Sequence, residues 1–126
     1  MATILIADDD TANRLLVVTL LKHAGHTVFE ASDGAAALQY VGERRFDLVL
    51  VDLSMPGLSG AEFIRTVRAG AHDPTVAIAL YTGTPENTAI REFMEIYGVR
   101  CAISKPSEPR DFLRAIETAL QGGDAT

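Results

Sequence analysis

Residues 46–60 read FDLVLVDLSMPGLSG, where an apolar run stops at Asp52 and a turn-rich loop follows. The run is apolar almost continuously, as expected of a strand in a parallel sheet that helices cover on both faces. Pro56, Gly57 and Gly60 are turn residues that set the backbone of the loop that follows. The stretch therefore predicts a central strand of an α/β protein, with a carboxylate presented at the edge of the sheet.

Strand-like and helix-like segments alternate along the rest of the chain. Strands are predicted near residues 3–7, 27–30, 47–52, 75–81 and 100–104. The intervening segments carry apolar residues at helical spacing, namely Ala12, Leu15, Leu16 and Leu20; Ala37, Leu38 and Val41; Phe63, Ile64 and Val67; Ile90, Phe93, Met94 and Tyr97; and Phe112, Leu113, Ile116 and Leu120. We interpret each of these groups as the core face of a helix rather than as a binding groove.

Strand–helix units in this succession predict the fold class. Five such units indicate an open (βα)5 α/β sandwich, with a five-stranded parallel sheet, helices on both faces and right-handed crossovers. Thr11 and Asp33 are the predicted N-caps of the first two helices. Gly25, Gly70 and Gly98 are suited to helix ends.

Length and composition fit a single globular domain. The 126 residues are 48% hydrophobic and 22% charged, and we assign residues 1–121 to the domain and 122–126 to a tail or the start of a linker. The net charge of −6 argues against a broad nucleic-acid surface, which would need a basic face. The single cysteine, Cys101, lies in an apolar run and is predicted to be buried. Without a basic leader or a run of membrane-spanning length, we expect a cytoplasmic protein.

Polar residues of complementary types stand at the ends of four predicted strands. Asp8 and Asp9 follow the first strand, and Asp52 ends the third. Thr82 follows the fourth strand and Lys105 the fifth. Because the carboxyl ends of parallel strands meet at one edge of a sheet, these side chains are expected to converge there. Such a cluster can hold a divalent cation and exchange a phosphoryl group.

Each polar strand end also has an ordinary explanation when it is taken alone. Asp8 and Asp9 can be loop acids beside a helix N-terminus, and the others can be turn caps or solvated side chains. Asp10 is interpreted as a solvated neighbour rather than as a further ligand. Adjacent carboxylates repel each other, however, and a bound Mg²⁺ would relieve that repulsion. The rigid loop after Asp52 can also turn the main-chain carbonyl of Ser54 toward a metal.

The ordered set Asp-Asp, Asp, Thr and Lys-Pro, each at a strand end, resembles the receiver domain of two-component response regulators, the CheY-like family. The resemblance runs from Ile4 to about Leu120 and includes the DLSMPGLSG loop. It implies the flavodoxin-like strand order 2-1-3-4-5. The implied partners are a sensor histidine kinase or phosphotransfer protein, which supplies the phosphoryl group, and an unidentified effector protein or domain. A homodimer, where one forms, would use the fourth and fifth helices.

The resemblance also implies a role for each acidic residue. Asp52 would be the phosphoacceptor, attacking the phosphoryl group of a phosphohistidine. Asp9, Asp52 and the backbone carbonyl of Ser54 would bind Mg²⁺ directly, and Asp8 would act through a coordinated water.

The remaining two residues would respond to the phosphoryl group. Lys105 would pair with Asp52 at rest and with the phosphoryl group afterwards, its side chain directed inward by a cis bond to Pro106. Thr82 would move toward a phosphoryl oxygen and pull the loop before the fourth helix with it.

The chain departs from the family pattern in its fifth strand. Ala102 stands three residues before the lysine, where many receivers carry the Tyr or Phe that reports phosphorylation. Output is therefore predicted to rely on the loop at residues 83–87 and on the fourth helix. Tyr81 and Tyr97 are interpreted as packing residues rather than as substitute switches.

Two other functions stay open at this point. One is an inert receiver-like module that only binds a partner. The other is a metal-dependent phosphatase of the haloacid dehalogenase type, which also uses Asp, Lys and Mg²⁺. Residues 8–12, DDDTA, lack the final Thr or Val of that family's nucleophile motif, and the chain has no cap insertion. We predict that the protein does not turn over external substrates and that it catalyses its own phosphorylation and dephosphorylation. We also predict that it binds neither nucleic acid nor membranes.

Overall fold

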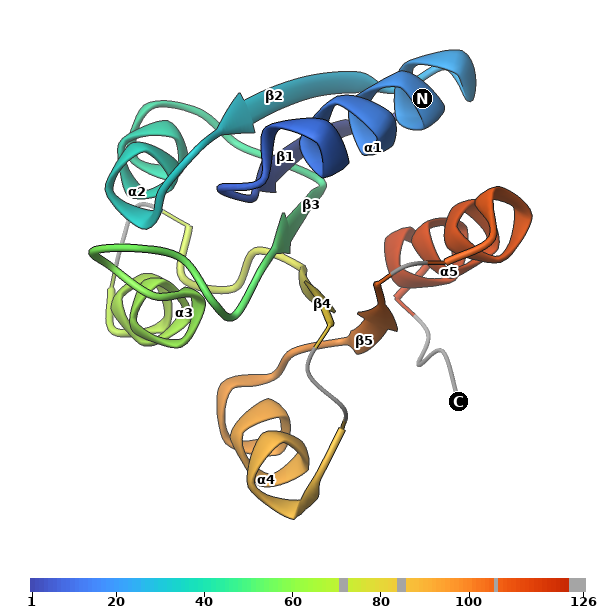
Figure 1. The fold of residues 1–126 in the computed structure, drawn as a ribbon. Helices are drawn as coiled ribbons and strands as arrows, with labels where there is room; N and C mark the ends of the chain where they lie inside the picture. Colours follow the sequence, from blue (N-terminus) through green and yellow to red (C-terminus); the bar gives the residue numbers. More distant parts are fainter. Residues whose placement is uncertain (71–72, 84–85, 106, 123–126) are drawn as a thin grey trace.

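The computed structural model describes residues 1–70, 73–83, 86–105 and 107–122, in which strands and helices alternate (Figure 1). The elements are β1 (Thr3–Ala7), α1 (Thr11–His23), β2 (Thr27–Ala31), α2 (Gly34–Glu43), β3 (Leu48–Val51), α3 (Gly60–Arg68), β4 (Ile78–Thr82), α4 (Thr88–Tyr97), β5 (Cys101–Ser104) and α5 (Pro109–Leu120). The predicted alternation is confirmed, although β4 begins three residues later than expected. Within the described residues, no helix has the length and hydrophobicity that crossing a membrane requires.

All neighbouring strands are parallel, in the order β2-β1-β3-β4-β5, as predicted. Ala7 at the end of β1 pairs with Val51 at the end of β3. The next residue continues this ladder, because the N–H of Asp52 donates to the carbonyl of Ala7 over 3.0 Å. Likewise the N–H of Lys105 donates to the carbonyl of Thr82 over 3.0 Å. The register therefore brings the polar strand ends to a single edge of the sheet.

Side chains of the strands alternate between two apolar layers. Val49 and Leu80 face one layer, which they share with α2, α3 and partly buried residues of α4. Leu50 and Tyr81 face the other layer, together with α1 and α5. Figure 1 shows these two groups of helices on opposite sides of the sheet. The open α/β sandwich predicted from the sequence is confirmed.

The predicted core face of the first helix is wrong at three of its four residues. Leu15 and Leu16 are 64% and 52% exposed, and Ala12 is exposed as well. The buried residues of α1 are Val17, Val18 and Leu21, and of the predicted set only Leu20 packs against the core, partly buried. Residues 15–21 are apolar at every position except Thr19, so spacing alone does not decide which side of this helix is buried.

The N-cap of α1 also differs from the prediction. Asp10, rather than Thr11, precedes the helix, and its side chain accepts a hydrogen bond from the N–H of Asn13 over 3.0 Å. Asp10 is therefore a structural cap and not merely a solvated neighbour. The cap predicted for α2 is confirmed, because the side chain of Asp33 accepts from the N–H of Ala36 over 2.7 Å.

Helix α4 is less buried than the other helices. The predicted core face of α3 is completely buried, whereas no residue of α4 is classed as buried. Its predicted face packs only partly into the core, through Ile90, Phe93, Met94 and Tyr97. Gly98 ends the helix in the left-handed conformation, with φ of 64°, as its residue type suggested.

Arg68, the last residue of α3, binds the chain around the C-terminal end of α4. Its Nε donates to the carbonyl of Tyr97 over 2.6 Å, and one Nη donates to that of Gly98 over 3.3 Å. The other Nη donates to the carbonyls of Pro74 and Val76, over 3.0 and 2.7 Å. Burial lowers the pKa of this guanidinium, but arginine has so high an ordinary value that the group stays charged. One side chain thus joins α3, the loop before β4 and the end of α4.

Arg68→Ala is expected to lower the free energy of unfolding by about 2–4 kcal/mol, because several carbonyls lose a charged donor together. Arg68→Lys should recover only part of the loss, since an ammonium cannot reproduce the guanidinium fork. Urea unfolding followed by circular dichroism measures both changes. Arg91→Ala, at an exposed position of α4, is the matched control and should change stability little. An Arg68→Ala variant as stable as this control would contradict the assignment.

Candidate functional site

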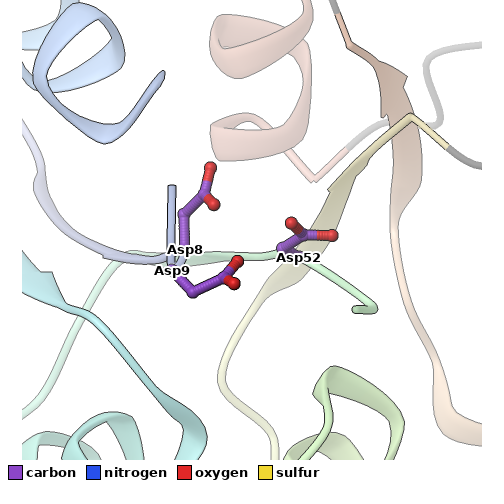
Figure 2. Close-up of side chains that lie close together, drawn as sticks. All are labelled: Asp8, Asp9 and Asp52. Atoms are coloured by element: carbon purple, nitrogen blue, oxygen red, sulfur yellow. The ribbon is translucent and has the colours of Figure 1, made fainter. Parts of the chain in front are cut away.

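Three carboxylates meet at the edge of the sheet where β1 and β3 end (Figure 2). Asp8, Asp9 and Asp52 each offer a carboxylate oxygen, and these oxygens lie within 4.8 Å of one another. Asp8 and Asp52 are buried, with 1% and 7% of their surface exposed, whereas Asp9 is exposed. The structure thus brings together the acidic residues that the sequence singled out, with one of them open to solvent.

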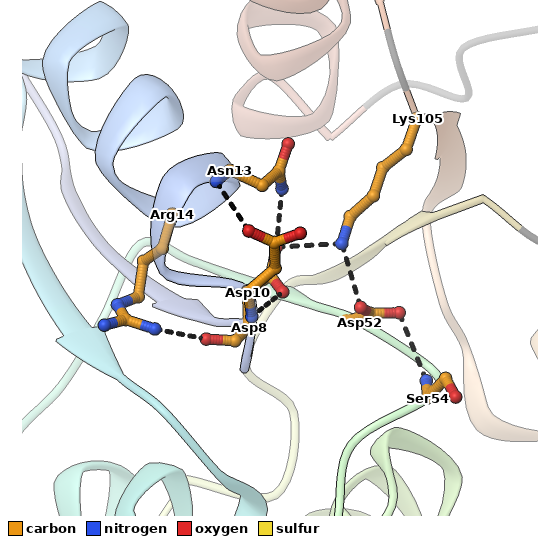
Figure 3. A network of polar contacts seen from close by, with 7 residues as sticks. All are labelled: Asp8, Asp10, Asn13, Arg14, Asp52, Ser54 and Lys105. Atoms are coloured by element: carbon orange, nitrogen blue, oxygen red, sulfur yellow. Dashed lines mark hydrogen bonds and ion pairs between the residues drawn. The ribbon is translucent and has the colours of Figure 1, made fainter.

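Lys105 links two of these acids. Its Nζ lies 2.9 Å from Oδ2 of Asp52, so the predicted pairing at rest is present. The same Nζ lies 2.8 Å from Oδ2 of Asp8, a contact that we did not predict (Figure 3). β1 and β3 are adjacent in the sheet, and their ends are close enough for one ammonium to bridge both acids.

Asp8 is fixed by donors from the start of α1 as well. Its Oδ1 accepts from the N–H of Asp10 over 3.0 Å, and its Oδ2 accepts from the side-chain amide of Asn13 over 2.5 Å. Arg14 donates to the carbonyl of Asp8 over 2.7 Å (Figure 3). Sequence reasoning missed both Asn13 and Arg14. The signal in the sequence was that both residues lie in the first turn of the helix that follows Asp8 and Asp9. Capping by Asp10 places that turn next to Asp8.

Asp52 has a different donor on each oxygen. The N–H of Ser54 donates to Oδ1 over 3.1 Å, and Lys105 occupies Oδ2. The backbone carbonyl of Ser54 as a metal ligand stays a prediction. Thr82, the last residue of β4, is buried with 4% of its surface exposed. It lies at the same edge of the sheet, beside the backbone of Lys105.

The charges at this edge do not balance within the protein. Burial alone would lower the pKa of Lys105, but hydrogen bonds and charge from Asp52 and Asp8 outweigh burial and raise that pKa. Among the described residues, the ammonium of Lys105 is the one cation in an ion pair with these three carboxylates, so the cluster keeps an excess of negative charge. Oxygen donors with excess negative charge fit a hard divalent cation such as Mg²⁺.

Lys105→Met is expected to lower the free energy of unfolding near neutral pH in metal-free buffer, because Asp8 and Asp52 then repel without an intervening cation. The folded-state pKa of Lys105 lies above its ordinary value of 10.5. Its ion pairs therefore stabilise the fold fully below that pH, and the contribution is lost as pH rises through the folded-state pKa. The stability gap between wild type and variant should narrow in this alkaline range.

Urea unfolding in the presence of a chelator, at neutral and at alkaline pH, measures that gap. Lys22→Met removes the only other lysine, which is exposed on α1, and should leave a small gap at both values. A Lys105→Met gap that widens with alkaline pH would refute the assigned ion pairs.

The packing predictions for Tyr81, Tyr97 and Cys101 are confirmed. Tyr81 is buried and its ring contacts that of Phe112, with centroids 5.3 Å apart. Tyr97 packs against Phe93, with centroids 4.7 Å apart, and Cys101 is buried. Ala102 faces the opposite layer from Tyr81 and is partly buried beside α4.

Some predicted features lie outside the described residues. They are residues 84–85 of the loop before α4, Pro106 with its predicted cis bond, and residues 123–126 of the predicted tail. The assignments made for them stay predictions.

Known proteins are similar to this chain in sequence and in fold. The chain matches the family described as the response regulator receiver domain over residues 4–117. It is 34% identical over 126 residues to the response regulator receiver protein CpdR of Brucella abortus, a match covering 95% of this chain and 98% of CpdR. It is 34% identical over 113 residues to the CAI-1 autoinducer sensor kinase/phosphatase CqsS of Vibrio cholerae, covering 87% of this chain but only 16% of CqsS.

A solved structure supports the same relationship. The chemotaxis protein CheY4 of Vibrio cholerae has a TM-score of 0.87 and 28% sequence identity, and the match covers 94% of this chain and 98% of CheY4. Together with the sheet order and the acid cluster, these matches show that the chain belongs to the response regulator receiver domain family.

Proposed function

We propose that this protein accepts one phosphoryl group on Asp52, from the phosphohistidine of a sensor histidine kinase or phosphotransfer protein, in a Mg²⁺-dependent reaction. The observation that carries the proposal is the bridging ammonium of Lys105, within 2.9 Å of Asp52 and 2.8 Å of Asp8. A buried carboxylate held next to a fixed cation can approach an anionic phosphoryl group with less repulsion.

The transfer needs little covalent chemistry from the protein. A carboxylate oxygen of Asp52 forms a bond to phosphorus as the phosphorus–nitrogen bond of phosphohistidine breaks. The imidazole nitrogen leaves with the electron pair, and Asp52 becomes an acyl phosphate. Lys105 then neutralises charge on the phosphoryl oxygens, and the hydroxyl of Thr82 donates to one of them.

Receiver domains bind Mg²⁺ at an acidic site, and the residues here fit that ion. We propose that Asp9, Asp52 and the carbonyl of Ser54 hold it directly, with Asp8 acting through a coordinated water. When bound, Mg²⁺ supplies positive charge to the transferring phosphoryl group. The exposed position of Asp9 leaves this side of the cluster open to a hydrated ion.

We further propose that phosphorylation changes contacts with an effector protein or domain through α4 and the loop before it. Any homodimer would use α4 and α5. The chain matches nearly all of CpdR but only a small part of CqsS. The proposal therefore covers both an effector that is a separate protein and one that is a domain of the same polypeptide. The receiver assignment for residues 1–121 and a cytoplasmic location both stay proposals. Receiver domains are generally not metabolic enzymes. We propose that catalysis here is confined to the protein's own phosphorylation and dephosphorylation.

Intact mass spectrometry after incubation with Mg²⁺ and acetyl phosphate tests this proposal. We expect one phosphoryl group per chain, and none when EDTA removes the metal. A protein that neither binds Mg²⁺ nor gains mass would instead be the inert interaction module. Repeated turnover of p-nitrophenyl phosphate would favour the phosphatase alternative.

A further inference from the structure

We propose that Tyr81 is a positioning residue for Lys105, whose ammonium is held against the face of its ring while bridging Asp8 and Asp52. This inference rests on the proposed function, because the position of that ammonium matters for phosphoryl transfer. Tyr81 precedes Thr82 directly, and its described contacts are with Lys105 and Phe112. Its contribution is therefore exerted through Lys105.

The ammonium of Lys105 has a partner on each of three sides. Nζ lies 5.3 Å from the centroid of the Tyr81 ring, inside the range of about 6 Å for a cation–π contact. The same atom lies 2.8 Å from Asp8 and 2.9 Å from Asp52. Only 17% of the Lys105 side chain is exposed, and 4% of Tyr81. Because little water reaches the contact, the attraction between ring and ammonium is weakly screened.

Strand register explains why the two side chains meet. Tyr81 of β4 pairs with Ile103 of β5 in the parallel ladder. Side chains alternate along a strand, so Lys105, two residues after Ile103, leaves the backbone toward the same face. The ring is buried on an inner strand of the sheet and packs against Phe112 of α5. Lys105 therefore extends along the face of a buried, packed ring on its way to the acids.

A ring face suits a cation that must shift its contacts during the reaction. At rest, Nζ donates to Asp52, and after transfer it would donate to a phosphoryl oxygen attached to Asp52. A ring face attracts the ammonium without requiring one hydrogen-bond direction, so the contact can persist through this short displacement. A third carboxylate in that place would add negative charge beside the incoming phosphoryl group.

The test changes the electron density of the ring while keeping its shape. Tyr81→Phe keeps the ring face, and mono-, di- and trifluorinated phenylalanines at position 81 weaken it stepwise with little change in size. The rate of phosphorylation by acetyl phosphate at saturating Mg²⁺ is measured for each variant. We expect Tyr81→Phe to stay near the wild-type rate, and the trifluorinated variant and Tyr81→Leu to fall about three- to tenfold. The same series at Tyr97, which packs against Phe93, is the control and should show no trend.

A second measurement reports the contact without phosphorylation. Lys22 and Lys105 are the only lysines, so protein labelled with ¹⁵N-lysine gives two ammonium signals at most. The ring should shift the Lys105 side-chain signals upfield in wild type and in Tyr81→Phe. That shift should disappear in Tyr81→Leu, while the Lys22 signals stay in place.

The outcomes separate this inference from the proposed function. A phosphorylated wild type with equal rates across the fluorinated series overturns the role of Tyr81 alone. The role of Tyr81 is also overturned if the fluorinated variants react at the full rate and Tyr81→Leu is slow only because it is less stable. That result would indicate simple packing. A wild type that accepts no phosphoryl group refutes the proposed function, and the inference falls with it.

Discussion

Asp52→Asn is expected to take up no detectable phosphoryl group from acetyl phosphate while keeping the fold. The amide oxygen is a far weaker nucleophile than a carboxylate, and the neutral side chain no longer draws the ammonium of Lys105 to the acceptor position. The substitution preserves size, and Lys105 keeps its ion pair with Asp8. Intact mass and thermal melting, measured on the same sample, separate the loss of the acceptor from loss of structure.

Asp47→Asn is the matched control for that experiment. Asp47 lies just before β3, at the opposite end of the strand from Asp52, and its carboxylate accepts from the N–H of Thr3 over 2.7 Å. This variant should be phosphorylated like wild type. Labelling of Asp52→Asn to the wild-type level would mean that the acceptor is another carboxylate, with Asp8 and Asp9 the next to replace.

Gly60→Ala, which adds a single methyl group, should cause a large loss of stability. A Cβ at this first residue of α3 would lie 2.1 Å from the carbonyl oxygen of Asp52 and 2.8 Å from Cα of Leu53. Both are backbone atoms, so the start of α3 or the end of β3 must move. We expect a cost of about 3 kcal/mol or more in the free energy of unfolding, together with slower phosphorylation of whatever protein stays folded.

Gly83→Ala provides the comparison for this substitution. A Cβ there would meet the carbonyl oxygen of Lys105 at 3.9 Å, an ordinary contact, and Gly83 does not have a positive φ. Its stability should stay within about 1 kcal/mol of wild type, since alanine also restricts the unfolded chain. Urea unfolding of both variants decides the matter. A Gly60→Ala protein as stable as Gly83→Ala would show that the loop after β3 yields without strain.

The fold could be predicted from the sequence because its strongest signals are local. The apolar run ending at Asp52 and the polar ends of β1, β4 and β5 each mark a strand terminus, and parallel strands allow few arrangements of such termini. The prediction failed in α1, where Leu15 and Leu16 are exposed. That helix is apolar on most of its sides, and only packing against the sheet selects the buried one.

The candidate site could be predicted in its composition but not in its connections. Asp8 and Asp52 were placed together by topology, whereas the bridge of Lys105 to Asp8 depends on side-chain reach. The contacts of Asn13 and Arg14 with Asp8 depend on the position of the first turn of α1. That position follows from capping by Asp10, whereas the sequence prediction placed the cap at Thr11. The ring of Tyr81 meets Lys105 through strand register, which no pattern within either strand specifies.

The hydrogen bonds of Arg68 make the two ends of α4 mechanically unequal. The guanidinium donates hydrogen bonds to the carbonyls of Tyr97 and Gly98, while the start of the helix at Thr88 follows the loop after Thr82. If that loop moves on phosphorylation, we expect the start of α4 to move further than its end, which Arg68 holds. The ten residues of α4 span about 15 Å, so a small rotation of the helix about its C-terminal end displaces Thr88 more than any other residue of the helix.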